Sequence, residues 1–235
     1  MPKIVIDPGH GGADPGAVGP SRVQEKDVNL SVSKLVADIL SSVAEVRLTR
    51  SGDPAPGDEN NELWVRAQIA NNWGADCFVS VHCNSAASPQ AHGTETYHYT
   101  GSSRGKGLAT GIQKRLLGSL GLADRGVKEA NFAVLRLTQC PAALAELAFI
   151  SNSTEERYLK SPDFQAKAAR AIAEGVADFL GLEIAAEEKV KINVAGMVLD
   201  GIMIGDLTYV PVRALAEALG RTVEWDEQNK TVNIA

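Results

Sequence analysis

The sequence of 235 residues is poor in cysteine, in aromatic residues and in long apolar runs. Its three cysteines, Cys77, Cys83 and Cys140, are irregularly spaced and form no CxxC pair. This excludes a disulfide framework and a zinc site built from CxxC pairs, so we expect free, buried thiols. No apolar run approaches the roughly 20 residues that a transmembrane helix needs, so we expect no membrane span.

Positive charge is also scarce. The chain has 23 Lys and Arg against 29 Asp and Glu, a net charge of −6. No basic face is therefore available for nucleic acid, and we expect no nucleic-acid partner. The hydrophobic fraction of 44% and the charged fraction of 22% are typical of a soluble globular protein and exclude extensive disorder.

Over the first 180 residues, apolar strands alternate with amphipathic helices. Residues 3–7 and 75–84 have the pattern of buried strands, and residues 25–42 and 163–180 have helical spacing of apolar side chains. This alternation predicts an α/β layered domain with a largely parallel central sheet flanked by helices.

The composition changes towards the carboxyl end, which predicts a second domain. We place a first domain at 1–182, a linker at 183–189 and a small α+β domain at 190–235. Within the small domain we expect short strands, a helix at 212–219 and a hairpin turn around 227–230. About fifty residues bury little core, so this unit should be of modest stability.

Two histidines stand at the ends of predicted strands. His10 follows the first strand in IVIDPGHGG, and His82 ends the strand in ADCFVSVHCN. The carboxyl ends of strands in an α/β sheet are where ligands bind. The glycines on both sides of His10 permit turns that are closed to other residues.

Two acidic residues complete a candidate set. Glu25 begins the first predicted helix, and Glu146 lies inside the apolar string 142–150, where an unpaired charge is costly. Two imidazoles and a carboxylate recur as ligands of catalytic zinc, and a second carboxylate could act as general base. Each residue also has a structural alternative: capping or packing for the histidines, the helix dipole for Glu25, and an ion pair for Glu146. The residues alone therefore lead only to the hypothesis of a metallohydrolase.

Six segments, in this order, resemble the zinc-dependent N-acetylmuramoyl-L-alanine amidases of the amidase-3 family. They are IVIDPGHGGADPGAVG, EKDVNL, LTR, RAQIAN, VSVHCN and ALAELAFISN, within residues 3–180. The resemblance implies that His10, Glu25 and His82 bind one catalytic Zn²⁺ and that Glu146 is catalytic. The chain departs from the family at Ala148, where glycine is common. A methyl group removes no functional group, so we expect activity to persist.

The resemblance also implies a reaction: hydrolysis of the amide between N-acetylmuramic acid and L-alanine in peptidoglycan (EC 3.5.1.28). Zinc would polarise the carbonyl and lower the pKa of water, and Glu146 would transfer the proton. Two alternatives stay open. One is a zinc peptidase that cuts the stem peptide, and the other is a wall-binding module that has lost catalysis.

Other polar residues of the first domain receive weaker interpretations. Asp7 could support a metal ligand or only the loop, and Asn84 could orient the loop after its strand. Arg50 and Arg66 match family positions but suit ion pairs that hold the fold equally well. We expect His98 to be solvated or to line the cleft rather than to bind metal.

The small domain resembles the copper amine oxidase N-terminal-like (stalk) domain in the stretch YVPVRALAEALGRTVEWDEQNKTVNI. Residues 184–235 contain neither His nor Cys, so we expect no copper site. Attachment to the cell wall, spacing and a purely structural role stay open.

The expected partner is peptidoglycan, and we expect a monomer. No secretory signal precedes the first strand, which begins directly after Met1-Pro2-Lys3. We expect the protein to act outside the cell, at the wall, either after release by lysis or after removal of a leader. A host autolysin, a sporulation enzyme and a phage lysin fit the sequence equally.

Overall fold

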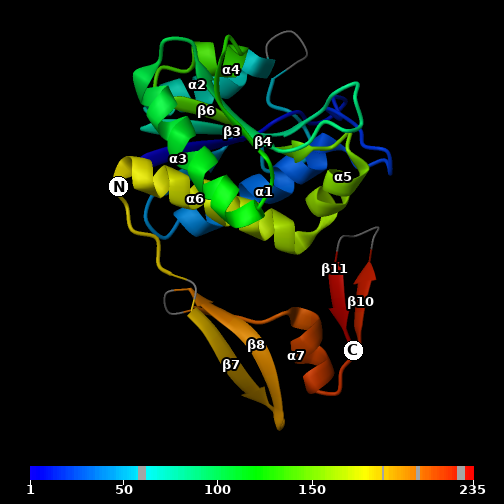
Figure 1. The fold of residues 1–235 in the computed structure, drawn as a ribbon. Coiled ribbons are helices and arrows are strands. Elements are labelled where there is room, and N and C mark those ends of the chain that lie inside the picture. The colour runs from blue at the N-terminus through cyan, green and yellow to red at the C-terminus, as the bar shows by residue number, and fades with distance from the viewer. Residues whose placement is uncertain (58–61, 187, 205–206, 227–230) are drawn as a thin grey trace. The chain divides into compact units, whose positions relative to one another are not determined.

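The computed structural model describes residues 1–57, 62–186, 188–204, 207–226 and 231–235. The chain divides into two compact units, Met1–Ile184 and Ala185–Ala235. Figure 1 shows the elements of both units. The turn predicted around 227–230 lies outside the described residues.

A six-stranded sheet forms the centre of the first unit, in the order β2-β1-β3-β6-β4-β5. The strands are β1 (Lys3–Pro8), β2 (Glu45–Leu48), β3 (Cys77–Asn84), β4 (Thr94–Tyr99), β5 (Asp124–Ala130) and β6 (Ala142–Phe149). Neighbouring strands are parallel except for β4 and β6, which pair antiparallel. The predicted α/β fold with a largely parallel sheet is confirmed.

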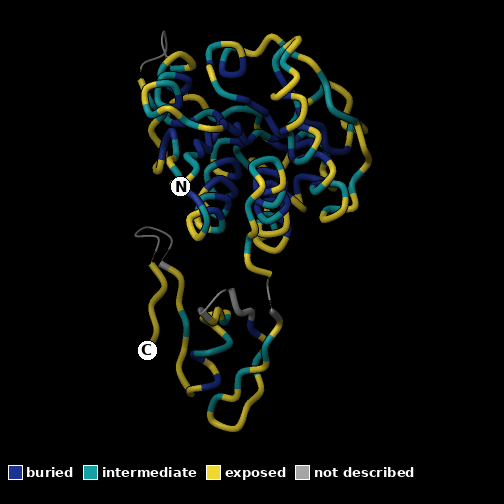
Figure 2. Tube along the Cα trace, turned by 90° about the vertical axis from the view of Figure 1, so that its left-hand side faces the viewer, coloured by how far each residue is buried: buried dark blue, intermediate teal, exposed yellow. Residues whose placement is uncertain are grey.

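Helices pack on both faces of this sheet. The larger core contains α1 (Glu25–Leu40), α3 (Ser103–Leu120) and α6 (Pro162–Leu180), and the smaller one α2 (Glu62–Trp73) and α4 (Ala133–Leu137). The helix α5 (Ser153–Lys160) follows β6. Figure 2 shows the buried residues of this unit gathered between the layers. In α1 the buried valines and leucine recur every four residues, which is the spacing that predicted the helix: Val28, Val32, Val36 and Leu40.

Strand alternation decides which side chains of β6 face the helices on each side. Ala143, Ala145 and Leu147 belong to the larger core, whereas Ala142 and Leu144 belong to the smaller one. Glu146 therefore shares the face of Leu144, because side chains two positions apart lie on the same side of a strand. The candidate site forms on this face.

The second unit is a small α+β assembly. Antiparallel strands β7 (Glu188–Val194), β8 (Met197–Ile204) and β9 (Leu207–Tyr209) form one sheet. The helix α7 (Val212–Ala218) precedes the antiparallel pair β10 (Val223–Asp226) and β11 (Thr231–Ile234). Among the described residues, no helix combines the length and apolarity needed to cross a bilayer.

Two glycines bring α3 and α6 into close contact. A Cβ atom added at Gly175 of α6 would lie 2.6 Å from the Cα atom of Ile112 in α3. One added at Gly111 of α3 would lie 3.1 Å from the carbonyl oxygen of Gly175. The backbones therefore approach more closely than any side chain at Gly175 would allow. In contrast, a Cβ at Gly118 of α3 would meet nothing within 4 Å.

This contact predicts opposite effects of the same substitution. Alanine favours a helix over glycine by about 1 kcal/mol, but overpacking costs about 1–3 kcal/mol. We expect Gly175→Ala to lower the free energy of unfolding by about 1–2 kcal/mol, and Gly118→Ala to leave it unchanged or raise it by up to about 1 kcal/mol. Urea unfolding of both variants measures this. Equal stability of the two would contradict the close contact.

Candidate metal and catalytic site

A buried ion pair fixes the loop that follows β1. The Oδ1 atom of Asp7 accepts a hydrogen bond from Nη1 of Arg66 at 2.7 Å, and both side chains are 1% exposed. Thr49 and Ser80 donate their hydroxyl protons to the same carboxylate at 2.5 and 2.6 Å. Burial alone would raise the pKa of Asp7, but the Arg66 charge and the hydrogen bonds outweigh it and hold the pKa below its usual value.

Two arginines bind the backbone carbonyls of this loop. Arg66 donates to the carbonyl oxygens of Pro8 and His10, both at 2.7 Å. Arg50 donates to those of Pro8 at 3.0 Å and Gly9 at 3.1 Å. These bonds hold His10 in a left-handed conformation, with φ of 62°, which is unfavourable for a residue with a Cβ atom.

The glycines around His10 leave room for the imidazole rings. A Cβ atom at Gly9 would lie 2.2 Å from the ring of His82. At Gly16, whose φ is 66°, it would lie 2.7 Å from both His10 Cδ2 and Glu25 Oε2. The loop therefore packs its backbone directly against the two rings and the carboxylate.

Three predicted residues converge at this point. His10 follows β1, His82 lies in β3 and Glu25 begins α1, and their candidate ligand atoms all lie within 4.8 Å of one another. The Oε1 atom of Glu25 is 3.2 Å from His10 Nε2 and 2.9 Å from His82 Nδ1. Zinc binds such nitrogen and oxygen atoms at about 2.0–2.2 Å, so the set fits one small divalent cation.

Neighbouring polar groups orient the candidate ligands. His10 Nδ1 lies 2.6 Å from Asp14 Oδ2, which leaves Nε2 directed towards Glu25. Glu25 accepts backbone N–H bonds from Ala17 at 2.8 Å and Cys83 at 3.0 Å. Burial alone would raise the pKa of Glu25, but the two histidines hold it well below its usual range. A carboxylate on one ring nitrogen is typical of metal-binding histidines.

Glu146 lies beside His82 on the same face of the sheet. The two residues are partners in the parallel pair β3–β6. The Oε2 atom of Glu146 is buried and has no hydrogen-bond partner within the described part of the chain. Burial raises the pKa of Glu146 to about 7, so near neutral pH this carboxyl group can both accept and give up a proton.

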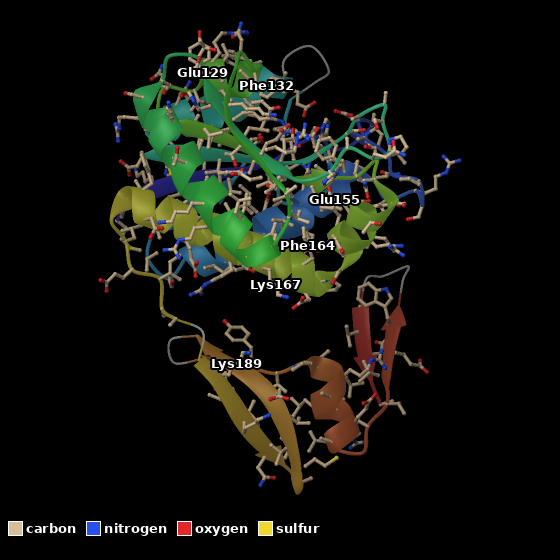
Figure 3. All side chains as sticks on the ribbon, viewed as in Figure 1. Glu129, Phe132, Glu155, Phe164, Lys167 and Lys189 are labelled. Carbon is tan, nitrogen blue, oxygen red and sulfur yellow. The ribbon has the colours of Figure 1, made fainter. Side chains whose placement is uncertain are left out.

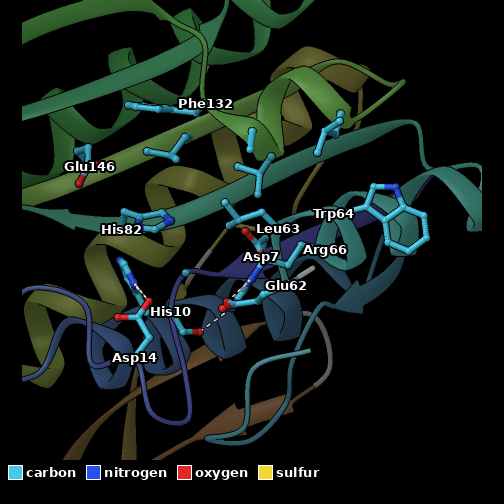
Figure 4. Close-up of a pocket in the computed structure, with 15 residues that line it drawn as sticks. Asp7, His10, Asp14, Glu62, Leu63, Trp64, Arg66, His82, Phe132 and Glu146 are labelled. Carbon is cyan, nitrogen blue, oxygen red and sulfur yellow. Dashed lines mark hydrogen bonds and ion pairs between the residues drawn. The ribbon is translucent and has the colours of Figure 1, made fainter. Parts of the chain in front are cut away.

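A cleft of about 630 Å³ opens over these residues. Figure 4 shows His82 between His10 and Glu146 on one side of it. Leu63 and Trp64 of α2, with exposed fractions of 50% and 54%, line it further along. The site therefore combines a polar floor with an apolar wall.

Several predictions need correction or refinement. His98 is 2% exposed and lies on the face of β4 that α3 covers, where Thr96 bonds Gln113, so the prediction of a solvated or cleft-lining position is wrong. Strand alternation was correct, but it does not say which face is buried.

Cys140 is only half-buried, unlike the other two free cysteines. Ala148 packs in the larger core and does not line the cleft.

Asp14 and Glu95 were not predicted as part of the site. Asp14 stands four residues after His10, within the quoted motif, and its position in that loop was the available signal. Glu95 lies in a strand with alternating polar residues, and nothing in its local sequence sets it apart. Asn84, in contrast, donates to Glu95 at 2.6 Å rather than acting on its own loop alone.

Comparison with known proteins identifies this arrangement. Residues 4–178 match the N-acetylmuramoyl-L-alanine amidase family. The chain belongs to this family. Residues 184–235 match the copper amine oxidase N-terminal domain, so the amidase is followed by a second, smaller domain.

Named relatives agree with the family. The amidase is 38% identical over 179 residues to the N-acetylmuramoyl-L-alanine amidase LytC of Bacillus subtilis, covering 75% of this chain but 35% of LytC. It is 41% identical over 194 residues to the endolysin of Bacillus phage SPP1, covering 78% of this chain and 68% of the endolysin. The catalytic domain of CwlV from Bacillus (Paenibacillus) polymyxa superposes with a TM-score of 0.73 at 41% identity, covering 78% of this chain and all of that domain. The predicted family and reaction class, hydrolysis of a peptidoglycan amide, are confirmed.

The buried ion pair between Asp7 and Arg66 predicts that the stability of the protein depends on pH. Removing one partner of a buried pair costs about 3–5 kcal/mol. Glu62 also bonds Arg66, so for Asp7→Asn we expect a loss near the lower end, about 3 kcal/mol at pH 7. Because the pKa of Asp7 is lowered in the folded state, its contribution is complete above the unfolded pKa of about 3.9 and is lost as the pH falls through the folded pKa. The difference between the two proteins should therefore shrink below about pH 4.

Asp163→Asn is the matched control for this prediction. Asp163 pairs with Lys167 at 2.7 Å on the surface of α6, with side chains 76% and 54% exposed. Such a pair contributes at most about 0.5 kcal/mol. Denaturant unfolding between pH 3 and 7 compares the two variants. A similar loss in both would mean that the Asp7 pair is no more important than a surface one.

Proposed function

We propose that the chain is a zinc-dependent amidase that cleaves the bond between N-acetylmuramic acid and L-alanine in peptidoglycan. In this proposal His10, Glu25 and His82 bind one Zn²⁺ and Glu146 is the catalytic base. The observation that carries it is the approach of two imidazole nitrogens and a carboxylate oxygen to within 4.8 Å, beside the buried Oε2 atom of Glu146, which has no hydrogen-bond partner among the described residues.

The donor set suits zinc because two nitrogens and one oxygen leave a coordination position for water or substrate. When bound, the ion would supply Lewis acidity towards the scissile carbonyl. Lys26 and the arginines around the loop are engaged with carboxylates and carbonyl oxygens, so the cleft floor keeps its negative groups for a cation.

Glu146 transfers the proton in this mechanism. Its carboxylate accepts a proton from the attacking water and then donates it to the nitrogen of L-alanine as the amide bond breaks. The pKa of about 7 suits both steps, because the group is protonated and deprotonated at similar cost near neutral pH. Asp14 holds His10 by its Nδ1 atom, and Glu25 lies between both rings.

The remaining assignments follow the same proposal. Residues 1–182 form the catalytic domain, 183–189 the linker, and 190–235 a stalk-like domain that binds or spaces the protein on the wall. Its lack of His and Cys argues against copper binding. The protein acts outside the cell, on the wall, as the name of the phage endolysin relative suggests. It acts there as a monomer.

Digestion of purified sacculi tests the reaction. With zinc present we expect new L-alanine amino ends and stem peptides freed from intact glycan strands, and a chelator should abolish both. Mass analysis of the fragments measures this. Cleavage between stem residues would instead identify a stem peptidase, and binding without fragments would identify a wall-binding module.

Two substitutions separate the roles of the site residues. Glu146→Gln should lower kcat about 10²–10⁴-fold while the protein still binds one zinc ion, because only proton transfer is lost. His10→Ala should lose the ion as well, because one ligand is removed. Metal analysis alongside the sacculus assay distinguishes them.

The exposed Glu129 of β5 provides the control, since Glu129→Gln makes the same chemical change outside the cleft (Figure 3). Full activity of Glu146→Gln would remove Glu146 from catalysis. Stoichiometric zinc in His10→Ala would refute the ligand set.

A further inference from the structure

Beyond Glu146, the same face of the sheet carries a second buried carboxylate with two cations. Glu95 of β4 is 3% exposed and accepts a hydrogen bond from Arg125 Nε at 2.8 Å. Lys128 Nζ also bonds this carboxylate. Asn84 Nδ2 and the Tyr97 hydroxyl donate to its other oxygen at 2.6 and 2.8 Å. We call Glu95, Arg125 and Lys128 together the cation pair site.

The charges of the cation pair site do not cancel. One carboxylate bonds two cations, which leaves a formal excess of one positive charge among these three groups. Glu155 also interacts electrostatically with Arg125, but its carboxylate accepts the backbone N–H groups of Gly93 and Phe149. Burying Glu95 requires one counter-charge and satisfied oxygens, and Asn84 and Tyr97 already supply two of the hydrogen bonds. Arg125 and Lys128 are 36% and 38% exposed, so their outer faces can reach a ligand.

Arg125 is held in place on several sides. Its guanidinium carbon lies 4.7 Å from the centre of the Phe149 ring, and Nη1 lies 3.4 Å from the carbonyl oxygen of His92. A Cβ atom at Gly93 would lie 3.1 Å from its side chain. A cation fixed in this way loses little conformational entropy when it binds an anion.

The cation pair site lies within reach of the reaction centre. Glu95 is directly opposite Glu146 in the antiparallel pair β4–β6, so their side chains leave the same face about 5 Å apart. Strand β5, with both cations, is the next strand, about 10 Å from β6. Two residues of an extended peptide reach about 7 Å, and the long side chains of Arg and Lys cover the rest.

We propose that Arg125 and Lys128 form a carboxylate subsite for the second residue of the stem peptide. This inference rests on the proposed function, because it places the scissile amide at Glu146. The subsite favours a stem whose second residue has a free α-carboxylate (D-glutamate) over one with a carboxamide (D-isoglutamine). Among the described residues that line the cleft on the α2 side with Leu63 and Trp64, the cation is Arg66, which is 1% exposed and already paired with Asp7 and Glu62.

Binding measurements test the subsite without requiring turnover. All proteins compared carry Glu146→Gln, and the probes are MurNAc-L-Ala-D-Glu and MurNAc-L-Ala-D-isoGln, which differ only in that carboxylate. We expect the acid to bind about tenfold more tightly, the size of one charge-assisted hydrogen bond. Adding Arg125→Gln should bring the two Kd values close together. Isothermal titration calorimetry or NMR titration gives the ratio.

Two further variants make the test robust. Lys128→Gln is the second variant, for the case in which Arg125→Gln fails to fold. It keeps Arg125 as the counter-charge of the buried Glu95 carboxylate, and it should also reduce the Kd ratio. Lys167→Gln on α6 removes the same charge far from Phe132, a residue that lines the cleft (Figure 3), and should keep the ratio. Equal Kd values in the parent protein, or an unchanged ratio in both cation variants, would overturn the subsite.

The outcome is separable from that of the proposed function. If the wild-type protein releases stem peptides from sacculi but the Kd ratio is close to one, the amidase assignment stands and the subsite is wrong. If no wall fragment is released but the ratio is tenfold and sensitive to Arg125→Gln, the subsite stands and the reaction is wrong.

Discussion

The ion pair between Asp7 and Arg66 is the constraint on which the site depends. It lies at the end of β1, almost without solvent exposure, and Arg66 continues from it to the carbonyl oxygens of Pro8 and His10. A backbone in the left-handed region would relax if those carbonyls were free. The buried pair holds Arg66 in place, and Arg66 in turn fixes the backbone that positions the imidazole of His10.

The other functional side chains lie on neighbouring strands of the sheet, and these strands are distant from one another in the sequence. Glu146 of β6 is the register partner of His82 in β3 on one side and of Glu95 in β4 on the other. Their side chains share one face, which the smaller core covers only in part. The antiparallel entry of β4 beside β6 brings Glu95 and its cations next to Glu146, so a polar row crosses strands that are distant in sequence.

Much of this could be predicted from the sequence because the signals are local. The strand ending in His10, the helix beginning at Glu25 and the apolar string around Glu146 each have a clear periodicity, and the motifs supply the family. The convergence of the ligand atoms and the partners of Asp7 depend on long-range pairing, which no local pattern encodes. His98 illustrates the limit: alternation gives its neighbours on the strand, but only α3 packing shows that this face is buried. Glu95 was missed for the same reason, since its cations come from a strand thirty residues later.

The contact between Gly9 and the ring of His82 has a consequence for how such chains are compared. The ring occupies the space where any side chain at position 9 would begin. A protein could thus keep every coordinating and proton-transferring group and still be inert, because one methyl group at that glycine displaces an imidazole. A check of the catalytic residues in its sequence would find them all present. The empty space at position 9 is therefore as much a part of the active centre as the atoms around it.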